Sequence, residues 1–394
     1  MNILIINSGS SSIKYQLLEM PSAKIICLGS IERIGSKEAI SSYKTDHVKI
    51  EKIYEIKDHK AGLKRITSLL LDSEKGVIKS TDDIDAIGHR VVHGGSSYTK
   101  TTLINEEVKN KIKNLSPLAP LHNPANLEGI LMAEEIFDTS KQFVVFDTAF
   151  HGTIPVKAKQ YAIPGELYKE KGIQAYGFHG TSHKYVSEKA IEYLKLKKSK
   201  LISIHLGNGC SITAIKDGKS VDHSMGFAPS NGLVMGTRSG DIDHSIIFYM
   251  VDTLRYSIDD VKELLNKQSG MLGLTGYNDL RDIESEASKG NNECILALEM
   301  NAYRIKKYIG AYTATMNGLD AIIFTAGIGE NSSLMRQLVC KDMNYFNIHL
   351  DDAKNDLRSS TIREINTESS KVKILVIPTN EELEIAKQVY NLIA

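Results

Sequence analysis

The chain lacks the features that define several large classes of protein. Its 394 residues include 48 basic and 48 acidic side chains, so the formal net charge is zero and no long-range field favours nucleic acid or a membrane surface. No run approaches 18 apolar residues, and the apolar start is only four residues long with no basic segment before it. We therefore expect no nucleic-acid partner, no membrane partner and no targeting segment.

Cysteine is also scarce. Cys27, Cys210, Cys294 and Cys340 are scattered without any C-x-x-C pair, which argues against a disulfide framework and against a cysteine-based zinc site. We expect reduced thiols and a cytoplasmic protein. The length and the 42% of hydrophobic residues suffice for two or three domains with sizeable cores, and small-molecule chemistry is the favoured function.

The P-loop signature G-x-x-x-x-G-K-[ST] is missing, but the first residues offer another way to hold phosphate. The apolar run 3–6, the small polar run 7–12 and a second strand-like run predict strand, tight turn and strand. Gly9, Ser10 and Ser12 let backbone N–H groups approach an anion, and Lys14 lies just beyond the turn. We interpret this stretch as a phosphate-holding hairpin; a Ser-rich surface turn is the alternative.

The same design returns later in the chain. Residues 201–215 read as a second strand–turn–strand unit, and the apolar run 321–324 leads into a Gly-rich segment, 325–331. This repetition predicts an internally duplicated, two-lobed nucleotide clamp of the α/β class. We place the N-terminal lobe at residues 1–150, joined by a C-terminal helix at about 382–394, and a nucleotide-binding lobe at 151–381.

Charged residues stand where predicted strands end. Arg90 lies near the end of the strand within 84–95, and Asp147 follows the buried-type strand 143–146; open α/β sheets place ligands at such ends. Capping of the next turn is an alternative role for Asp147. The proline-rich loop 117–124 is either a rigid connector or part of the same site, and we predict a helix at 125–137 after it.

Two further segments suggest chemistry. His179 and His183 have the spacing of a metal pair, but Gly180 and the capping residues after it place His179 before the helix, so we do not favour metal ligation. Arg238 lies in a Gly-rich loop, where we expect Asp241 and Asp243 to fix its guanidinium for anion transfer; a solvated loop is the alternative.

Helices are predicted at 245–255, 258–267 and 292–316, and a final helix at 382–393. Thr379 and Glu382 fit a capping box at the start of the last one. This assignment leaves Glu381 free to point at a cation.

Together these segments resemble acetate kinase, in the superfamily of acetate and sugar kinases, heat-shock chaperones and actin. NSGSSSIKY, GHRVVHGG, APLHNPANL, FDTAFH, YGFHGTSH, HLGNGCS, MGTRSGDID, FTAGIGEN and PTNEEL occur in the family's order from end to end. The resemblance implies two duplicated ribonuclease-H-like domains in an actin-like ATPase fold, with a nucleotide cleft between them. It also implies a homodimer that phosphorylates acetate with ATP, reversibly and by direct in-line transfer, giving acetyl phosphate and ADP.

The resemblance further implies roles for individual residues. It assigns catalysis to Arg90, Asp147, His179 and Arg238, and Mg²⁺, which Mn²⁺ can replace, to Asn7 and Glu381. Substrate contacts fall on Arg90, Val92, Leu121, His122, Phe178 and Pro229. Nucleotide contacts fall on Ser10, Ser12, Lys14, His205, Leu206, Gly207, Asn208, Gly209, Asp279, Leu280, Arg281, Gly327, Ile328, Gly329, Glu330 and Asn331.

Some positions depart from the family pattern. Cys210 stands where alanine is common, the loop 228–231 and His244 differ, and the segment 274–278 puts the contacts to the nucleobase in doubt.

Elementary chemistry agrees with the assignment. Phosphoryl transfer depends mainly on positioning and on charge stabilisation, and a carboxylate, which titrates at roughly 4, is already ionised at neutral pH. Asp147 therefore need not remove a proton, and we favour a role in orienting an arginine or a metal-bound water.

Three other functions remain open. Propionate or another short-chain carboxylate could be the main substrate, since one methylene is worth only about 1–3 kcal/mol in an apolar pocket. An ATP-driven binding module like the chaperones would need a peptide-binding appendage, for which no residues follow Glu381 beyond one helix. A sugar kinase of the same fold needs an aspartate base, which Asp147 could supply, but Arg90, His179 and Arg238 suit two anionic reactants better.

Overall fold

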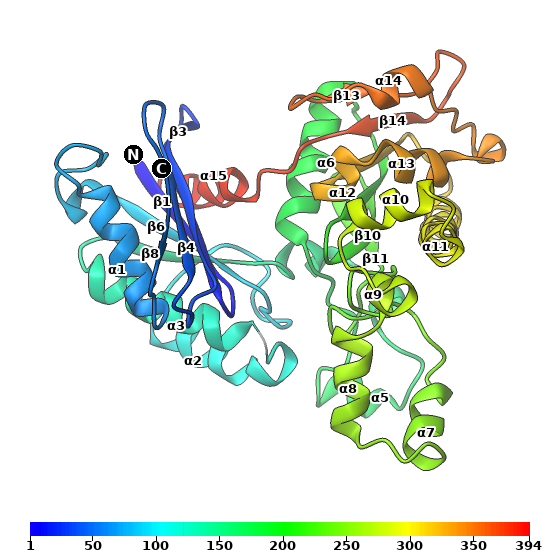
Figure 1. The fold of residues 1–394 in the computed structure, drawn as a ribbon, viewed down its shortest axis with the longest axis horizontal. Coiled ribbons are helices and arrows are strands. Elements are labelled where there is room, and N and C mark those ends of the chain that lie inside the picture. Colours follow the sequence, from blue (N-terminus) through cyan, green and yellow to red (C-terminus); the bar gives the residue numbers. More distant parts are fainter. Residues whose placement is uncertain (121) are drawn as a thin grey trace. The chain divides into compact units, whose positions relative to one another are not determined.

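The computed structural model describes residues 1–120 and 122–394, which form two compact units. Unit 1 comprises residues 1–149 and 380–394, and unit 2 comprises residues 150–379. Each unit contains its own sheet with helices on both faces (Figure 1). Within the described residues, no helix is both long enough and apolar enough to cross a membrane.

Unit 1 is built on an eight-stranded sheet with strand order β5-β4-β3-β2-β1-β6-β8-β7. β1 pairs antiparallel with β2 on one side and parallel with β6 on the other, and β6 pairs parallel with β8. The strands are β1 (Asn2–Ser8), β2 (Ser12–Glu19), β3 (Lys24–Glu32), β4 (Ala39–Lys44), β5 (Lys49–Tyr54), β6 (Ala86–Val91), β7 (Thr102–Leu103) and β8 (Lys141–Phe146).

The alternation of side chains along β1 separates the two cores of this unit. Leu4 and Ile6 face helices α1 (His59–Leu70) and α3 (Asn123–Ile136), while Ile3 and Ile5 face helix α15 (Glu381–Ile393). Successive residues of a strand point to opposite faces, so four consecutive isoleucines and leucines are buried on both sides. Helix α2 (Glu106–Asn114) packs beside α3.

Unit 2 is built on a six-stranded sheet with strand order β11-β10-β9-β12-β14-β13. Helix α6 packs through Val186 and Ala190 on one face of this sheet, and the long helix α11 lies on the other. The strands are β9 (Lys200–Leu206), β10 (Cys210–Lys216), β11 (Lys219–His223), β12 (Ala321–Thr325), β13 (Arg363–Glu364) and β14 (Lys373–Val376). The helices are α4 (Val156–Lys159), α5 (Gly165–Lys169), α6 (Gly180–Leu194), α7 (Ser245–Asp252), α8 (Ile258–Lys267), α9 (Gly270–Thr275), α10 (Leu280–Ser288), α11 (Asn292–Met316), α12 (Ala326–Asn331), α13 (Ser333–Cys340) and α14 (Asp352–Asp356).

The two sheets repeat one topology. In β2-β1-β6-β8 and in β10-β9-β12-β14, an antiparallel hairpin is extended by two parallel strands. The turns of the two hairpins, after β1 and after β9, are the two stretches that the sequence predicts to hold phosphate. The α/β fold class with internal duplication is confirmed.

Several element boundaries differ from the sequence predictions. The last helix begins at Glu381, and its N-cap is Asn380, whose side chain accepts a hydrogen bond from Leu383 N at 2.9 Å; the capping box built on Thr379 is wrong. The Gly-rich segment after β12 forms a short helix, α12, instead of an irregular strand end. Helices α8 and α11 have the predicted bounds, whereas α7 ends at Asp252, earlier than predicted.

Candidate active site

Arg90 and Asp147 form the polar centre of unit 1. They stand at the ends of the neighbouring parallel strands β6 and β8, so the topology brings them together. Arg90 Nε donates to Asp147 Oδ1 at 2.9 Å and Nη2 donates to Oδ2, a two-point contact with a carboxylate that is 1% exposed. Burial alone would lower the pKa of Arg90, but the charges of Asp147 and Glu381 outweigh burial and raise it. Arg90 is therefore a fixed, permanent cation.

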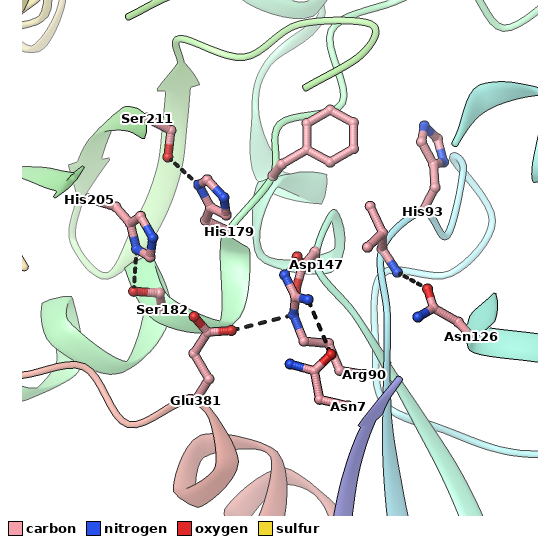
Figure 2. A network of polar contacts seen from close by, with 12 residues as sticks. Asn7, Arg90, His93, Asn126, Asp147, His179, Ser182, His205, Ser211 and Glu381 are labelled. Atoms are coloured by element: carbon pink, nitrogen blue, oxygen red, sulfur yellow. Dashed lines mark hydrogen bonds and ion pairs between the residues drawn. The ribbon is translucent and has the colours of Figure 1, made fainter. Parts of the chain in front are cut away.

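Asn7 and Glu381 approach the same guanidinium from opposite ends of the chain. Arg90 Nη1 donates to Asn7 Oδ1 at 3.4 Å, and Glu381 Oε2 lies 3.4 Å from Arg90 Nε; Figure 2 shows both side chains directed at Arg90. One amide oxygen and one carboxylate oxygen thus converge. Among residues 1–120 and 122–394, no group of three or more His, Cys, Asp or Glu side chains could hold a metal. A Mg²⁺ that keeps several waters and binds ATP oxygens fits this sparse set of oxygen ligands.

Two asparagines of α3 brace the strand ends of unit 1. Asn126 Oδ1 accepts from Val92 N at 3.1 Å, and its Nδ2 donates to Ser8 O at 2.6 Å. One turn earlier, Asn123 accepts from His93 N and donates to His93 O, each at 3.0 Å. Both asparagines are buried. They tie the end of β1, which carries Asn7, to the bend after Arg90, and the sequence reasoning gave them no role.

The predicted phosphate hairpin of unit 1 is a closed turn. Gly9 N donates to Ser12 O at 2.8 Å, and Gly9 O is 2.7 Å from His59 Nε2. Ser10 and Lys14 are exposed, and Ser12 is half-buried. The side chains that would contact an anion are therefore accessible on a turn whose backbone is held.

In unit 2, His179 is held both by its backbone and by its side chain. It precedes helix α6 with a left-handed backbone, φ 54°. The preceding residue, Phe178, donates its N–H to His223 Nε2 at 3.1 Å, and its carbonyl lies 2.9 Å from His151 Nε2. His151 and His223 are buried, and burial lowers the pKa of both, that of His151 to about 4. These two neutral histidines fix the peptide from which His179 projects.

The side chain of His179 converges with Arg238 beside a glycine. A Cβ atom added at Gly209 would lie 3.3 Å from both His179 Nε2 and Arg238 Nη2. The imidazole stacks on His205 with ring centroids 4.3 Å apart, and His179 Nδ1 is 2.9 Å from Ser211 Oγ (Figure 2). Glycine at position 209 therefore leaves room where two nitrogen donors meet.

Arg238 differs from Arg90 in its surroundings. Its Nη1 donates to the Pro229 carbonyl, and within the described part of the chain no carboxylate forms an ion pair with it. Desolvation lowers its pKa, and the weaker influence of Cys210 opposes this change. A half-buried guanidinium without a counter-charge is suited to an anionic ligand.

The expectation that Asp241 and Asp243 fix the Arg238 guanidinium is wrong. Asp243 accepts from Ser245 N at 2.8 Å, and Asp241 accepts from Gly232 N at 2.7 Å and from Tyr308 OH at 2.7 Å. Arg304, on the same helix as Tyr308, also donates to the Gly232 carbonyl at 2.9 Å. Asp241 therefore closes the loop that carries Arg238 and ties it to α11, instead of touching the arginine.

Several segments of unit 2 line a cavity of about 700 Å³. They include the turn after β9, the start of α10 and helix α12. At the start of α10, Asp279 and Arg281 pair with each other, and the arginine lowers the pKa of Asp279 to about 2. Predicted nucleotide residues on its wall are Gly207, Asn208, Asp279, Leu280, Arg281, Gly327, Ile328 and Asn331.

Other predicted nucleotide residues of unit 2 do not line this cavity. They are His205, Leu206, Gly209, Gly329 and Glu330, although His205 and Gly209 adjoin His179. Glu330 instead accepts from Thr379 N at 3.0 Å, and burial raises its pKa. The wall also includes residues from strand β10, loops and helices to which the sequence analysis gave no ligand role: Cys210, Met235, Gly236, Met271, Asn278, Glu284, Asn301, Ser332 and Arg358.

The predicted acyl-pocket residues fall in both units. Val92 is buried in unit 1, and His122 is the N-cap residue of α3. In unit 2, Phe178 is buried and Pro229 holds Arg238 through its carbonyl. Leu121 lies outside the described residues.

Comparison with known proteins gives a consistent result. Residues 2–387 match the model of the Acetokinase family. The chain is 65% identical over 393 residues to an acetate kinase of Flavobacterium johnsoniae, with 100% of both chains covered. Among solved structures, Porphyromonas gingivalis acetate kinase superposes with a TM-score of 0.94 at 42% identity over 100% of both chains. A propionate kinase from Francisella tularensis gives 0.92 at 44% identity over 98% of both chains.

Proposed function

The chain belongs to the acetokinase family and is an acetate kinase, and from this premise we propose how its residues transfer the γ-phosphoryl group of ATP to acetate. The observation that carries the proposal is the environment of Arg238. Its half-buried guanidinium has no carboxylate partner among the described residues and meets His179 beside Gly209. These two groups would hold the equatorial oxygens of the transferring phosphoryl group, where charge shifts during the reaction.

The polar centre of unit 1 would bind the carboxylate substrate. Arg90 is a permanent cation whose orientation Asp147 fixes through two hydrogen bonds. Acetate is already ionised at neutral pH and needs no base. Asp147 therefore serves as an orienting group for Arg90, and Val92 and His122 of the same unit would limit the size of the acyl group.

Asn7 and Glu381 would hold Mg²⁺ through their side-chain oxygens, directly or through water. When bound, the ion neutralises charge on the ATP phosphates. Arg90 keeps both oxygens in place. Replacing Glu381 with alanine is expected to raise the magnesium concentration needed for half-maximal activity; an unchanged magnesium titration would remove Glu381 from this role.

Unit 2 would bind the nucleotide in its 700 Å³ cavity, whose size suits a ligand of this kind. In unit 1, the exposed side chains of Ser10 and Lys14 and the half-buried Ser12 would be available to contact a phosphate group. The donors that act on the phosphoryl group are preorganised and no covalent intermediate is required, so transfer is direct and in line.

The test is an ATP-dependent hydroxamate assay, which traps acyl phosphates, over acetate, propionate and butyrate, with glucose-dependent ADP release as a comparison. We expect an acyl phosphate from acetate at the highest kcat/KM and no glucose-dependent ADP release. Transfer to glucose, or ATP hydrolysis independent of any carboxylate, would contradict the proposal.

Propionate is the second candidate substrate. The similarity to a propionate kinase at 44% identity supports it, and the predicted pocket discriminates only by the shape of side chains such as Val92. We expect measurable activity with propionate at a lower kcat/KM than with acetate.

We further propose a cytoplasmic homodimer. The four cysteines of the chain are free and buried, which suits a reducing compartment. Helix α7 has no buried residue and exposes Ile246, Phe248 and Tyr249, and apolar surface of this kind is often covered by a second subunit. Sedimentation of the wild type should give twice the mass of one chain, and Phe248→Asp should give the mass of a single chain. Tyr345 is 90% exposed and lies outside helix α7, so the control variant Tyr345→Asp should stay dimeric.

A further inference from the structure

Ser211 lies within a chain of buried polar groups behind His179. Its Oγ is 2.9 Å from His179 Nδ1 and 2.8 Å from His183 Nε2. On the far side of the imidazole, His183 Nδ1 is 2.8 Å from Ser203 Oγ. Ser211, His183 and Ser203 are fully buried, and the proposed mechanism gives none of them a role. Figure 2 shows Ser211 reaching from its strand toward His179.

Counting hydrogens limits what this chain of groups can do. Burial lowers the pKa of His183 well below its ordinary value, so its imidazole is neutral and carries one N–H. Ser211 has a single hydroxyl hydrogen, which it gives either to His179 or to His183. If it donates to His179 Nδ1, then His183 Nε2 donates to Ser211, and the hydrogen of a neutral His179 sits on Nε2. If it donates to His183, then His179 Nδ1 must donate to Ser211, and a neutral His179 has a bare Nε2.

The position of His179 Nε2 decides between these arrangements. This atom faces the same point beside Gly209 as Arg238 Nη2. A bare nitrogen there would repel phosphoryl oxygens, whereas an N–H would donate to them.

We propose that Ser211 is a positioning residue, which donates its hydroxyl hydrogen to His179 Nδ1 and thereby keeps the His179 Nε2–H aimed at the transferring phosphoryl group. The inference rests on the proposed function, because it assumes that His179 acts on that group. Stacking on His205 fixes the ring plane, and the hydrogen bond from Ser211 fixes which nitrogen is protonated.

The kinetic test compares Ser211→Ala with Ser203→Ala. Both changes delete a fully buried hydroxyl that contacts His183, but only Ser211 also contacts His179. We expect Ser211→Ala to lower kcat at least about tenfold and to change the ATP KM by less than about threefold. Removing a donor outright typically lowers kcat by roughly 10²–10³-fold, which is the upper limit for a positioning residue. Ser203→Ala should retain nearly wild-type kcat. Equal losses in both variants, or a loss confined to KM, would overturn the proposal.

A direct readout is the tautomer of His179 by long-range ¹H–¹⁵N NMR of the free enzyme. His179→Gln identifies the signals by their loss. The proposal predicts a protonated Nε2 and an unprotonated Nδ1 in the wild type, and a mixture of tautomers in Ser211→Ala. A protonated Nδ1 with bare Nε2 in the wild type would overturn it. This spectrum does not depend on turnover, so it tests the role of Ser211 separately from the activity. A wild-type enzyme that forms no acyl phosphate would refute the proposed function instead.

Discussion

Arg90 and Arg238 are chemically identical side chains in opposite surroundings. Asp147 and Glu381 hold Arg90, whereas the half-buried Arg238 donates to the backbone carbonyl of Pro229 and has no carboxylate partner among the described residues. An arginine already neutralised by carboxylates suits the binding and orientation of a ground-state substrate. An arginine without a counter-charge stabilises the transition state most, because it interacts more strongly as charge shifts onto the transferring group.

Arg238→Ala is therefore expected to lower kcat by about 10³-fold or more and to leave the ATP KM within a few-fold, by analogy with arginine fingers. Arg238→Lys should restore little, because lysine keeps the charge but lacks the planar fork. Steady-state kinetics measures both, with thermal unfolding as the control for folding. A variant with normal kcat and a large increase in KM would show that Arg238 only binds substrate.

Val92 offers a test of the acyl pocket. Its side chain is buried and its N–H is held by Asn126, so truncation should leave the backbone in place. Val92→Ala adds room for roughly one methylene and should improve kcat/KM for propionate relative to acetate by about tenfold. The measurement is the ratio of the two kcat/KM values; an unchanged ratio would mean that Val92 does not line the pocket.

Sequence reasoning located individual chemical groups better than it found their partners. The proximity of Arg90 and Asp147 follows from two parallel strands that end side by side. Asp241 was misassigned because its partners, Gly232 and Tyr308, lie 9 and 67 residues away, and no local pattern encodes such contacts. Asn126 was missed for the same reason, since its contact to Ser8 spans 118 residues.

At the scale of elements, helix α11 does more than complete a core. Tyr308 and Arg304 tie it to the loop from Gly232 to Asp241, which carries Arg238. Gly232 and Gly240 have positive φ, 92° and 69°, so the path of this loop depends on conformations that other residues adopt only at a cost.

Tyr308→Phe removes the hydrogen bond to Asp241 and should lower kcat by roughly tenfold through misplacement of Arg238, with the ATP KM nearly unchanged. Tyr312→Phe is the matched control: it lies one turn along the same helix, and its buried hydroxyl has no partner among the described residues. That change should leave kcat and stability unchanged or raise stability. If the two variants behave alike, the loop does not depend on this contact.

The predicted bounds of helices are confirmed where apolar residues recur at helical spacing. The prediction is wrong where glycines lower the helix propensity of the segment. Helices α8 and α11 follow their patterns. Helix α12 was missed because Gly327 and Gly329 have low helix propensity.

For the whole molecule, buried neutral histidines predict sensitivity to acid. Burial lowers the pKa of His89 to about 4, although its hydrogen bond to Gln142 opposes the change. Between pH 6.5 and 4 the unfolded chain binds a proton that the folded chain does not, so stability falls as the pH drops through this window. One such group contributes roughly 1.4 kcal/mol per pH unit.

Denaturant unfolding of His89→Gln should therefore show a free energy of unfolding that depends less steeply on pH between 6.5 and 4 than that of the wild type. His47→Gln, at an exposed position, is the control and should follow the wild-type curve. Parallel curves for His89→Gln and the wild type would contradict the assignment of a neutral buried His89.

The central claim is that the phosphoryl group passes from ATP to acetate in one step, with Arg238 and His179 as donors and without a phosphorylated side chain. The configuration at phosphorus tests this claim most directly, with ATP whose γ-phosphorus is chiral through oxygen isotopes and with acetate as acceptor. A single in-line displacement predicts inversion of configuration in the acetyl phosphate formed. Retention would mean two successive displacements through a phosphoenzyme, and it would contradict the account.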